Sequence, residues 1–326
     1  MDINGKLRPL YLLQILQERT DEEHSLTTTE LCDILREEYG IDNTFRTTIK
    51  SDVEVLRRAG YSIQETRQKR NHYSYLGREF ELPELKLLID AVLSSKAISR
   101  RKGDALAKKL MKLAGPCGTE KLKRNLVAEG RVKTDNEQTM LIIDGINEAI
   151  NTGKKIRFRM VDYNRSKRKV LHNDGESYVF SPYSLVWDGD CYYVVGYSDK
   201  YQAIGSHRVD RIYQRPEILA EDAVPAPRGF RVERYINTMF RMFDAPRREV
   251  QLIADNRVMG AIVDKFGTGV RTEIYDADHV CLTAEVAVGT VFFNWVFGFR
   301  GLVKIQGPED VREEYRNRLK EAEENI

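Results

Sequence analysis

The chain has 326 residues, of which 41% are hydrophobic and 31% charged, and its formal net charge of +2 indicates no particular partner. This length predicts two or three domains, because single cores rarely grow beyond about 250–300 residues. No apolar run approaches the roughly 20 residues that span a bilayer, and the N-terminus has no signal-peptide pattern, so we expect a cytoplasmic protein that does not enter the membrane.

The amino-terminal pattern predicts three helices, the first over residues 6–19. Thr27 or Thr28 can cap the second helix, and Glu30 follows two or three residues later, as in a capping box. Gly40 then stops this helix.

The third helix is predicted over residues 45–59, with Asn43 or Thr44 as its cap. Apolar residues recur on one face of this helix at helical spacing, so we expect that face to lie against the core. The residues on this face are Ile49, Val53 and Leu56.

Polar side chains lie near the N-terminal half of the third helix, away from its apolar face. A helix-turn-helix recognition helix presents such side chains to the major groove of DNA. Arg and Lys can reach guanine edges or phosphates, while Thr and Ser suit phosphate contacts. The candidate DNA-contacting residues here are Thr44, Arg46, Thr47, Lys50 and Ser51.

Residues 61–66 and 72–76 are predicted to form a hairpin whose turn carries Arg67, Lys69 and Arg70 as a basic wing. From the third helix to the end of this hairpin, seven Lys or Arg stand against three Asp or Glu, an excess of positive charge that is typical of nucleic-acid binding but does not prove it. With a recognition helix, the expected partner is double-stranded DNA. The block FRTTIKSDVEVLRRAGYSI resembles the winged helix-turn-helix of DeoR-type regulators. The alternative is a trihelical module that binds protein and carries Arg and Lys as surface charge.

Apolar stripes predict further helices over residues 82–95, 102–114 and 137–151, with a break at residues 115–118. Helix pairs of this kind bridge domains or dimerise, and the sequence does not decide between these roles.

Short strands are predicted next, beginning with the alternating residues 155–163. An Asp-Gly turn joins residues 184–187 and 191–197 into a hairpin, and a last strand covers residues 203–212. About five short strands suit a small SH3-like or Sm-like β-barrel.

Residues 181–212 carry a family resemblance. Pro182 and Leu185 precede the turn, the aromatic strand CYYVVGY follows it, and HRVDRI closes the stretch. Together these features resemble the WYL-domain family of bacterial regulators, although only Tyr192 of the eponymous tripeptide matches. The resemblance implies an SH3-like or Sm-like barrel that senses a ligand and follows a DNA-binding domain.

The candidate ligand-binding residues are Tyr192, Ser206, His207, Arg208 and Arg211. Arginine offers a planar donor fork that matches phosphate, and Tyr can stack or donate a hydrogen bond. Alternation places Arg208 and Arg211 on opposite faces of a regular strand, so both can line one pocket only if a bulge or the strand end intervenes. The alternative for His207 is a structural histidine.

The carboxy-terminal part follows a proline-containing linker. Its pattern is strand, helix, strand, strand, helix, strand and a terminal helix, which is the split order of a ferredoxin-like fold. It resembles the C-terminal (WCX-like) extension that often follows WYL domains. We therefore expect a multidomain α+β protein. Its predicted parts are a winged helix-turn-helix at 1–78, a helical connector at 79–151, the WYL barrel at 152–217, a linker at 218–247 and the ferredoxin-like domain at 248–326.

These features predict a homodimeric transcription regulator that senses an anionic effector. The family resemblance implies that this effector is a nucleotide or single-stranded nucleic acid. Cys191, His207 and Asp210 could be interpreted as a catalytic set, but Asp210 and His207 fall on opposite strand faces, so we expect no enzyme. A protein-binding scaffold is the other alternative. Four cysteines lie far apart without a CxxC pair, so we expect reduced thiols, no metal and no cofactor.

Overall fold

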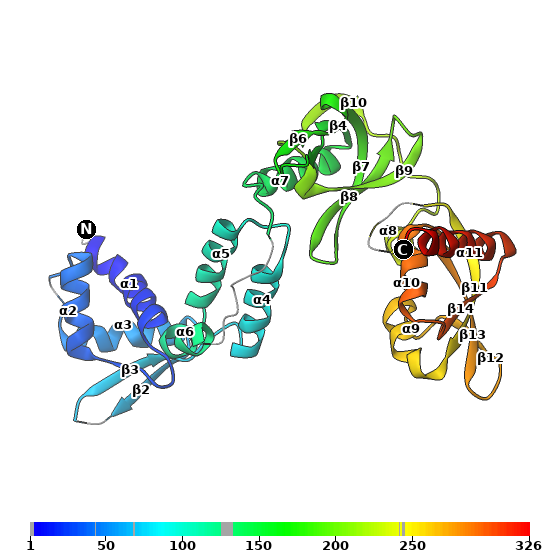
Figure 1. The fold of residues 1–326 in the computed structure, drawn as a ribbon. Helices are drawn as coiled ribbons and strands as arrows, with labels where there is room; N and C mark the ends of the chain where they lie inside the picture. The colour runs from blue at the N-terminus through cyan, green and yellow to red at the C-terminus, as the bar shows by residue number, and fades with distance from the viewer. Residues whose placement is uncertain (1–2, 43, 68, 125–132, 241, 243–244) are drawn as a thin grey trace. The chain divides into compact units, whose positions relative to one another are not determined.

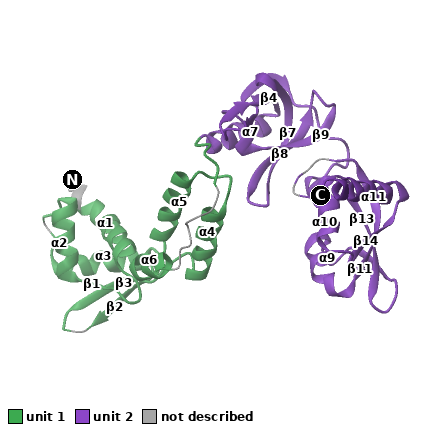
Figure 2. Ribbon diagram, viewed as in Figure 1, with its two compact units in different colours: residues 1–137 green, residues 138–326 purple. Residues whose placement is uncertain are grey.

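The computed structural model describes the chain except residues 1–2, 43, 68, 125–132, 241 and 243–244 (Figure 1). The chain forms two compact units, residues 1–137 and 138–326 (Figure 2). Each unit combines helices with antiparallel strands, so the protein is a mixed α/β chain of several domains. Among the described helices, none has the length and apolar character needed to cross a bilayer.

The first unit begins with three helices around one apolar core. Thr27 and Glu30 form the predicted capping box at the second helix, and Gly40 ends it in the left-handed conformation. The prediction for the cap of the third helix was wrong: Phe45 is its N-cap, and the Thr44 hydroxyl instead donates to the Ile41 carbonyl (3.3 Å). The other predicted cap, residue 43, lies outside the described residues. The three helices are α1 (Ile3–Arg19), α2 (Thr28–Tyr39) and α3 (Arg46–Arg58).

The predicted hairpin is present as β2 (Ile63–Arg67) and β3 (Asn71–Tyr75). A third strand that the sequence analysis missed, β1 (Leu26–Thr27), pairs with β3 on its other side. A two-residue strand carries no periodicity, so only its pairing reveals it. This pairing holds the hairpin against the start of α2.

A helical group completes the first unit: α4 (Leu82–Ser94), α5 (Arg100–Lys112) and α6 (Gly115–Arg124). The break predicted at residues 115–118 is instead the start of α6. Gly115 has φ +75°, which turns the chain, and Pro116 lies in the first helical turn, where a missing backbone N–H costs little.

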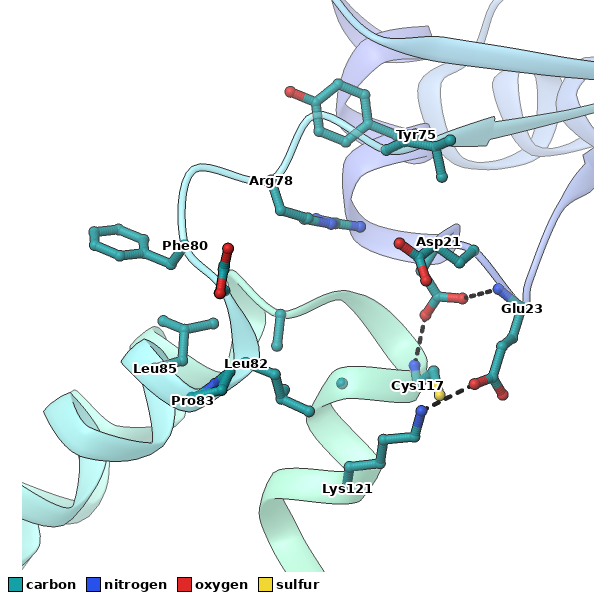
Figure 3. A pocket seen from close by; sticks show the side chains of 15 residues that line it. Asp21, Glu23, Tyr75, Arg78, Phe80, Leu82, Pro83, Leu85, Cys117 and Lys121 are labelled. Carbon is teal, nitrogen blue, oxygen red and sulfur yellow. Dashed lines mark hydrogen bonds and ion pairs between the residues drawn. The ribbon is translucent and has the colours of Figure 1, made fainter.

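Ion pairs and hydrogen bonds connect the three-helix core to this helical group (Figure 3). Arg78 donates to the carbonyls of Gln17 (2.8 Å) and Thr20 (2.6 Å), near the end of α1. The Asp21 carboxylate accepts the N–H of Cys117 (2.6 Å) in the first turn of α6. The charged side chains of Arg78 and Asp21 thus pair with backbone groups that the end of α1 and the start of α6 leave without intrahelical partners.

The second unit begins with α7 (Thr139–Thr152), which the sequence analysis assigned to the connector. Its residues Ile142, Ile146 and Ala149 are buried against an antiparallel sheet of five strands. The strand order is β10-β4-β7-β8-β9. The bounds are β4 (Lys154–Arg159), β7 (Ser177–Asp188), β8 (Cys191–Ser198), β9 (Ala203–Arg208) and β10 (Glu217–Asp222). A separate hairpin consists of β5 (Val161–Tyr163) and β6 (Lys169–Leu171), followed by the 3-10 turn η1 (His172–Gly175).

This sheet is open in the described part of the chain, where β9 and β10 form its two edges and no closed barrel is found. The strand predicted over residues 203–212 ends at Arg208, where the 3-10 turn η2 (Val209–Arg211) begins. The segment predicted as a linker at residues 218–247 contains most of β10 and also helix α8 (Val232–Asn237). Pairing with β4 makes β10 a strand, and a sequence pattern cannot reveal that pairing.

The carboxy-terminal elements follow the predicted order of strand, helix, strand, strand, helix, strand and helix. Four strands form one antiparallel sheet in the order β12-β13-β11-β14, and buried Phe292 and Leu252 lie in its core. The strands are β11 (Arg247–Asp255), β12 (Arg271–Ile274), β13 (His279–Ala287) and β14 (Val303–Gly307). The helical elements are η3 (Asn256–Val258), α9 (Met259–Phe266), α10 (Thr290–Gly298) and α11 (Glu309–Glu324).

Candidate nucleic-acid interface and ligand site

A basic hollow lies between the start of α3 and the turn of the β2–β3 hairpin. Arg46, Thr47 and Lys50 of α3 line it, together with Lys69 and Arg70 of the turn, and its volume is about 310 Å³. We call it the α3 hollow. Five of the eight predicted DNA-contacting residues therefore share one surface depression, and all five are exposed.

The acidic side chains of α3 are paired with arginines that lie outside the α3 hollow. Buried Asp52 of α3 is held by Arg8 of α1, with Nε–Oδ2 and Nη2–Oδ1 distances of 2.5 and 3.2 Å. Arg57 pairs with Glu54 (2.8 Å), so these two charges neutralise each other. Within the described residues, no ion pair involves the basic side chains of the hollow, and the charged residues that line it are all basic.

Three further residues line the α3 hollow that the sequence analysis did not select: Thr28, Thr29 and Asn71. The Thr28 hydroxyl donates to the Asn71 carbonyl (3.5 Å), which connects α2 to the hairpin. The Arg46 guanidinium donates to the Thr29 hydroxyl (3.4 Å). The sequence does show three consecutive threonines, Thr27 to Thr29, at the start of α2. The sequence analysis considered them only as helix caps and not as part of a binding surface.

The other predicted DNA contacts lie outside the lining of the hollow. Thr44 is partly buried beside Ile41, while Ser51 and Arg67 are exposed on α3 and at the end of β2. Their role in DNA binding stays a prediction.

The predicted ligand-binding residues are divided between the two faces of the five-stranded sheet. Tyr192 packs against the core beneath α7, and the ring of His207 lies among aromatic rings of that core. Ser206 and Arg208 lie on the opposite face, because neighbouring residues of a strand alternate. The Ser206 hydroxyl there donates to the carbonyl of Met242 (3.3 Å).

His207 is enclosed by three aromatic side chains. The ring centroids of Phe158, Tyr178 and Phe180 lie 5.3, 5.8 and 5.1 Å from its own. Burial among these rings lowers the pKa of His207 to about 4, because an apolar surrounding disfavours the imidazolium. The side chain is therefore neutral at pH 7 and offers no positive charge to an anion.

The second unit is expected to lose stability as the pH falls from about 6.5 to about 4, the ordinary and the folded pKa of His207. Over this range His207 is protonated in the unfolded chain but stays neutral in the folded chain. The free energy of unfolding therefore falls by roughly 2–3 kcal/mol. His207→Phe should flatten this part of the stability–pH curve, while the other four histidines remain as a shared background. Tryptophan fluorescence reports on this unit, since Trp187 and Trp295 both lie in it. An equally steep curve in the variant would contradict the assignment.

Arg208 and Arg211 have separate partners. Arg208 makes a two-pronged ion pair with buried Asp210, with Nε–Oδ1 and Nη2–Oδ2 distances of 3.1 and 2.8 Å, and this pairing raises its pKa. Arg211 lies in the turn η2, and its guanidinium carbon is 4.8 Å from the ring centroid of Tyr163. The strand end thus intervenes between the two arginines, yet the structure does not bring the five predicted residues into one site.

The comparisons with known proteins give one family match. The profile of the WYL domain matches residues 142–217. No curated protein matches the chain. Among solved structures, the chain is similar to proteasome accessory factor B/C (PafBC) of Arthrobacter aurescens, with 18% identity, a TM-score of 0.28 and coverage of 97% of this chain and 46% of that chain. It is also similar to a CRISPR Cas-related protein, with 15% identity, a TM-score of 0.38 and coverage of 99% and 84%.

The two structural similarities are weak. Both TM-scores are too low to establish the fold or the function of this chain, which spans less than half of the PafBC chain. The family match includes most of α7 and extends to the start of β10. The second unit of this chain therefore contains a WYL domain, as the resemblance of residues 181–212 predicted.

Proposed function

We propose that this chain is a DNA-binding transcription regulator whose WYL domain belongs to a ligand-sensing unit. The α3 hollow is the observation that carries the proposal. Basic and hydroxyl side chains from a helix and from a neighbouring hairpin turn converge there, and the basic ones have no ion-pair partner among the described residues. In our proposal α3 is the recognition helix of a winged helix-turn-helix, and the hairpin is its wing.

The second unit supplies the sensor in this proposal. Its five-stranded sheet would be an open relative of the SH3-like fold, and the carboxy-terminal sheet a ferredoxin-like domain. We propose a homodimer. Two winged helix-turn-helix domains could then bind two DNA half-sites, and the distance between the domains would set the spacing of the half-sites. The effector would be anionic, and its differential affinity for two states of the protein would change DNA affinity without any catalytic step.

Fluorescence anisotropy with random-sequence duplex DNA over a series of salt concentrations tests this function. The five side chains predicted to contact phosphates or bases in the α3 hollow include four cationic ones. If each cation neutralises one phosphate, a plot of the logarithm of the binding constant against the logarithm of the salt concentration should have a slope of about −4 for each winged helix-turn-helix. Absence of duplex binding even at low salt would refute the proposal and favour the protein-binding scaffold, whose contacts would depend little on salt.

A further inference from the structure

A second basic hollow lies in the second unit, beside helix α8. Its volume is about 310 Å³, and its lining comes from β9, from the segment before α8, from α8 itself and from the strands β11 and β13. We call it the α8 hollow. Four arginines and one carboxylate supply its charged groups, which are Arg228, Arg231, Arg234, Arg247 and Glu285.

The four arginines differ in whether another group neutralises their charge. Arg234 pairs with Glu285 at 2.8 Å, so one positive and one negative charge cancel. The guanidinium carbon of Arg247 lies 4.4 Å from the ring centroid of Tyr235, an interaction that leaves its charge uncompensated. Arg228 and Arg231 are exposed, and within the described residues neither takes part in an ion pair. The hollow therefore keeps a strong excess of positive charge.

Apolar groups stand next to these charges. Ile204 and Phe230 line the α8 hollow, and the Phe230 ring is held between Tyr183 and Tyr235, at centroid distances of 5.8 and 5.9 Å. Guanidinium groups bind phosphate, while aromatic rings and guanidinium planes stack on nucleobases. The volume lies at the small end of the range of about 300–1,000 Å³ that is usual for ligand sites.

The ligand-binding residues predicted from the sequence fit an anion less well. Arg208 is already bound by the carboxylate of Asp210, and His207 is enclosed by aromatic rings. The α8 hollow has four arginines instead, and among the described residues only Arg234 takes part in an ion pair.

We propose that the α8 hollow binds the phosphate group of a nucleotide, with Arg228 and Arg231 as its main contacts and Phe230 beside the base or sugar. The inference rests on the proposed function in one respect, because it identifies this nucleotide as the effector of the sensing unit. A ligand in the hollow touches β9, α8, β11 and β13 together. Binding therefore favours arrangements of the second unit in which these elements lie close to one another.

The test measures binding of single-stranded DNA to the full chain. Every protein compared carries Arg46→Ala and Lys50→Ala, which weaken DNA binding through the α3 hollow. A short fluorescein-labelled oligothymidine is the probe, and inorganic pyrophosphate and adenosine monophosphate compete with it. Arg228→Ala with Arg231→Ala is expected to weaken binding at least about tenfold and to make the salt slope shallower by about 1.4. Adenosine monophosphate is expected to displace the oligothymidine, and displacement by neither competitor would contradict a nucleotide site in the hollow.

The matched control replaces two other exposed arginines of the same unit, Arg165 and Arg168 in the turn between β5 and β6, by alanine. It removes the same charge and should change the affinity less than about twofold. Equal losses in both variants, no loss in the first, or no binding of any probe by the background protein would overturn the inference. Arg228→Lys with Arg231→Lys should recover part of the affinity, and this excludes misfolding as the cause of the loss.

Failure of this inference and failure of the proposed function can be told apart. In a chain with Arg46 and Lys50 intact, the Arg228→Ala and Arg231→Ala variant should still bind duplex DNA. A chain that binds oligothymidine through the α8 hollow but never binds duplex would refute the regulator and leave the hollow as a nucleotide site.

Discussion

Replacing Arg46 and Lys50 by alanine is expected to weaken binding to duplex DNA by on the order of a hundredfold, because each cation contributes roughly 1–2 kcal/mol through phosphate or guanine contacts. The salt slope should become shallower by about 2, since two fewer phosphates are neutralised. Both side chains are exposed on α3 and donate to none of the described carboxylates, so their loss leaves the core intact. Fluorescence anisotropy gives both quantities from one set of titrations.

Arg58 provides a matched control on the same helix. It is exposed in the last turn of α3 and lies outside the lining of the hollow. Compared singly, Lys50→Ala should cost about tenfold in affinity, while Arg58→Ala should cost less than about threefold. Equal losses would mean that the general charge of the domain attracts DNA. No loss in either variant would mean that α3 is not the recognition helix.

Gly196→Ala is expected to destabilise the WYL domain by about 3 kcal/mol or more. Gly196 of β8 lies opposite Pro182 of β7, where the register between the strands shifts. A Cβ atom at this position would lie 2.1 Å from the Ser181 carbonyl oxygen and 2.6 Å from the Phe180 ring. Backbone cannot rotate aside as a side chain can, so the two central strands would have to separate. Urea unfolding followed by tryptophan fluorescence measures the change.

Gly260→Ala serves as the comparison for this prediction. Gly260 is exposed in the first turn of α9, and no heavy atom lies within 4 Å of the position that a Cβ would occupy. The substitution should be neutral or stabilise by up to about 1 kcal/mol, because alanine has the higher helix propensity. A Gly196→Ala protein as stable as the Gly260→Ala protein would show that the strands do not approach as closely as the structure indicates.

Local sequence patterns determined many of the elements and part of the candidate site. The Thr27–Glu30 capping box and the apolar spacing of Ile49 and Val53 act within one or two helical turns, so they can be recognised without knowledge of the fold. The basic residues of α3 and of the hairpin turn were found in the same way. Charged side chains away from an apolar face are mostly exposed in folded proteins, so this part of the site follows from the local pattern.

Tertiary structure alone decided how the second unit is arranged. Strand alternation placed His207 and Arg208 on different faces, but it could not show which face lies under α7 or that Asp210 holds Arg208. The α8 hollow combines residues of β9 with residues of β13, about 80 positions further along the chain, and no sequence pattern links them. Strand β10 also exists because it pairs with β4. Contacts between distant segments depend on the whole fold, whereas capping and periodicity depend only on neighbouring residues.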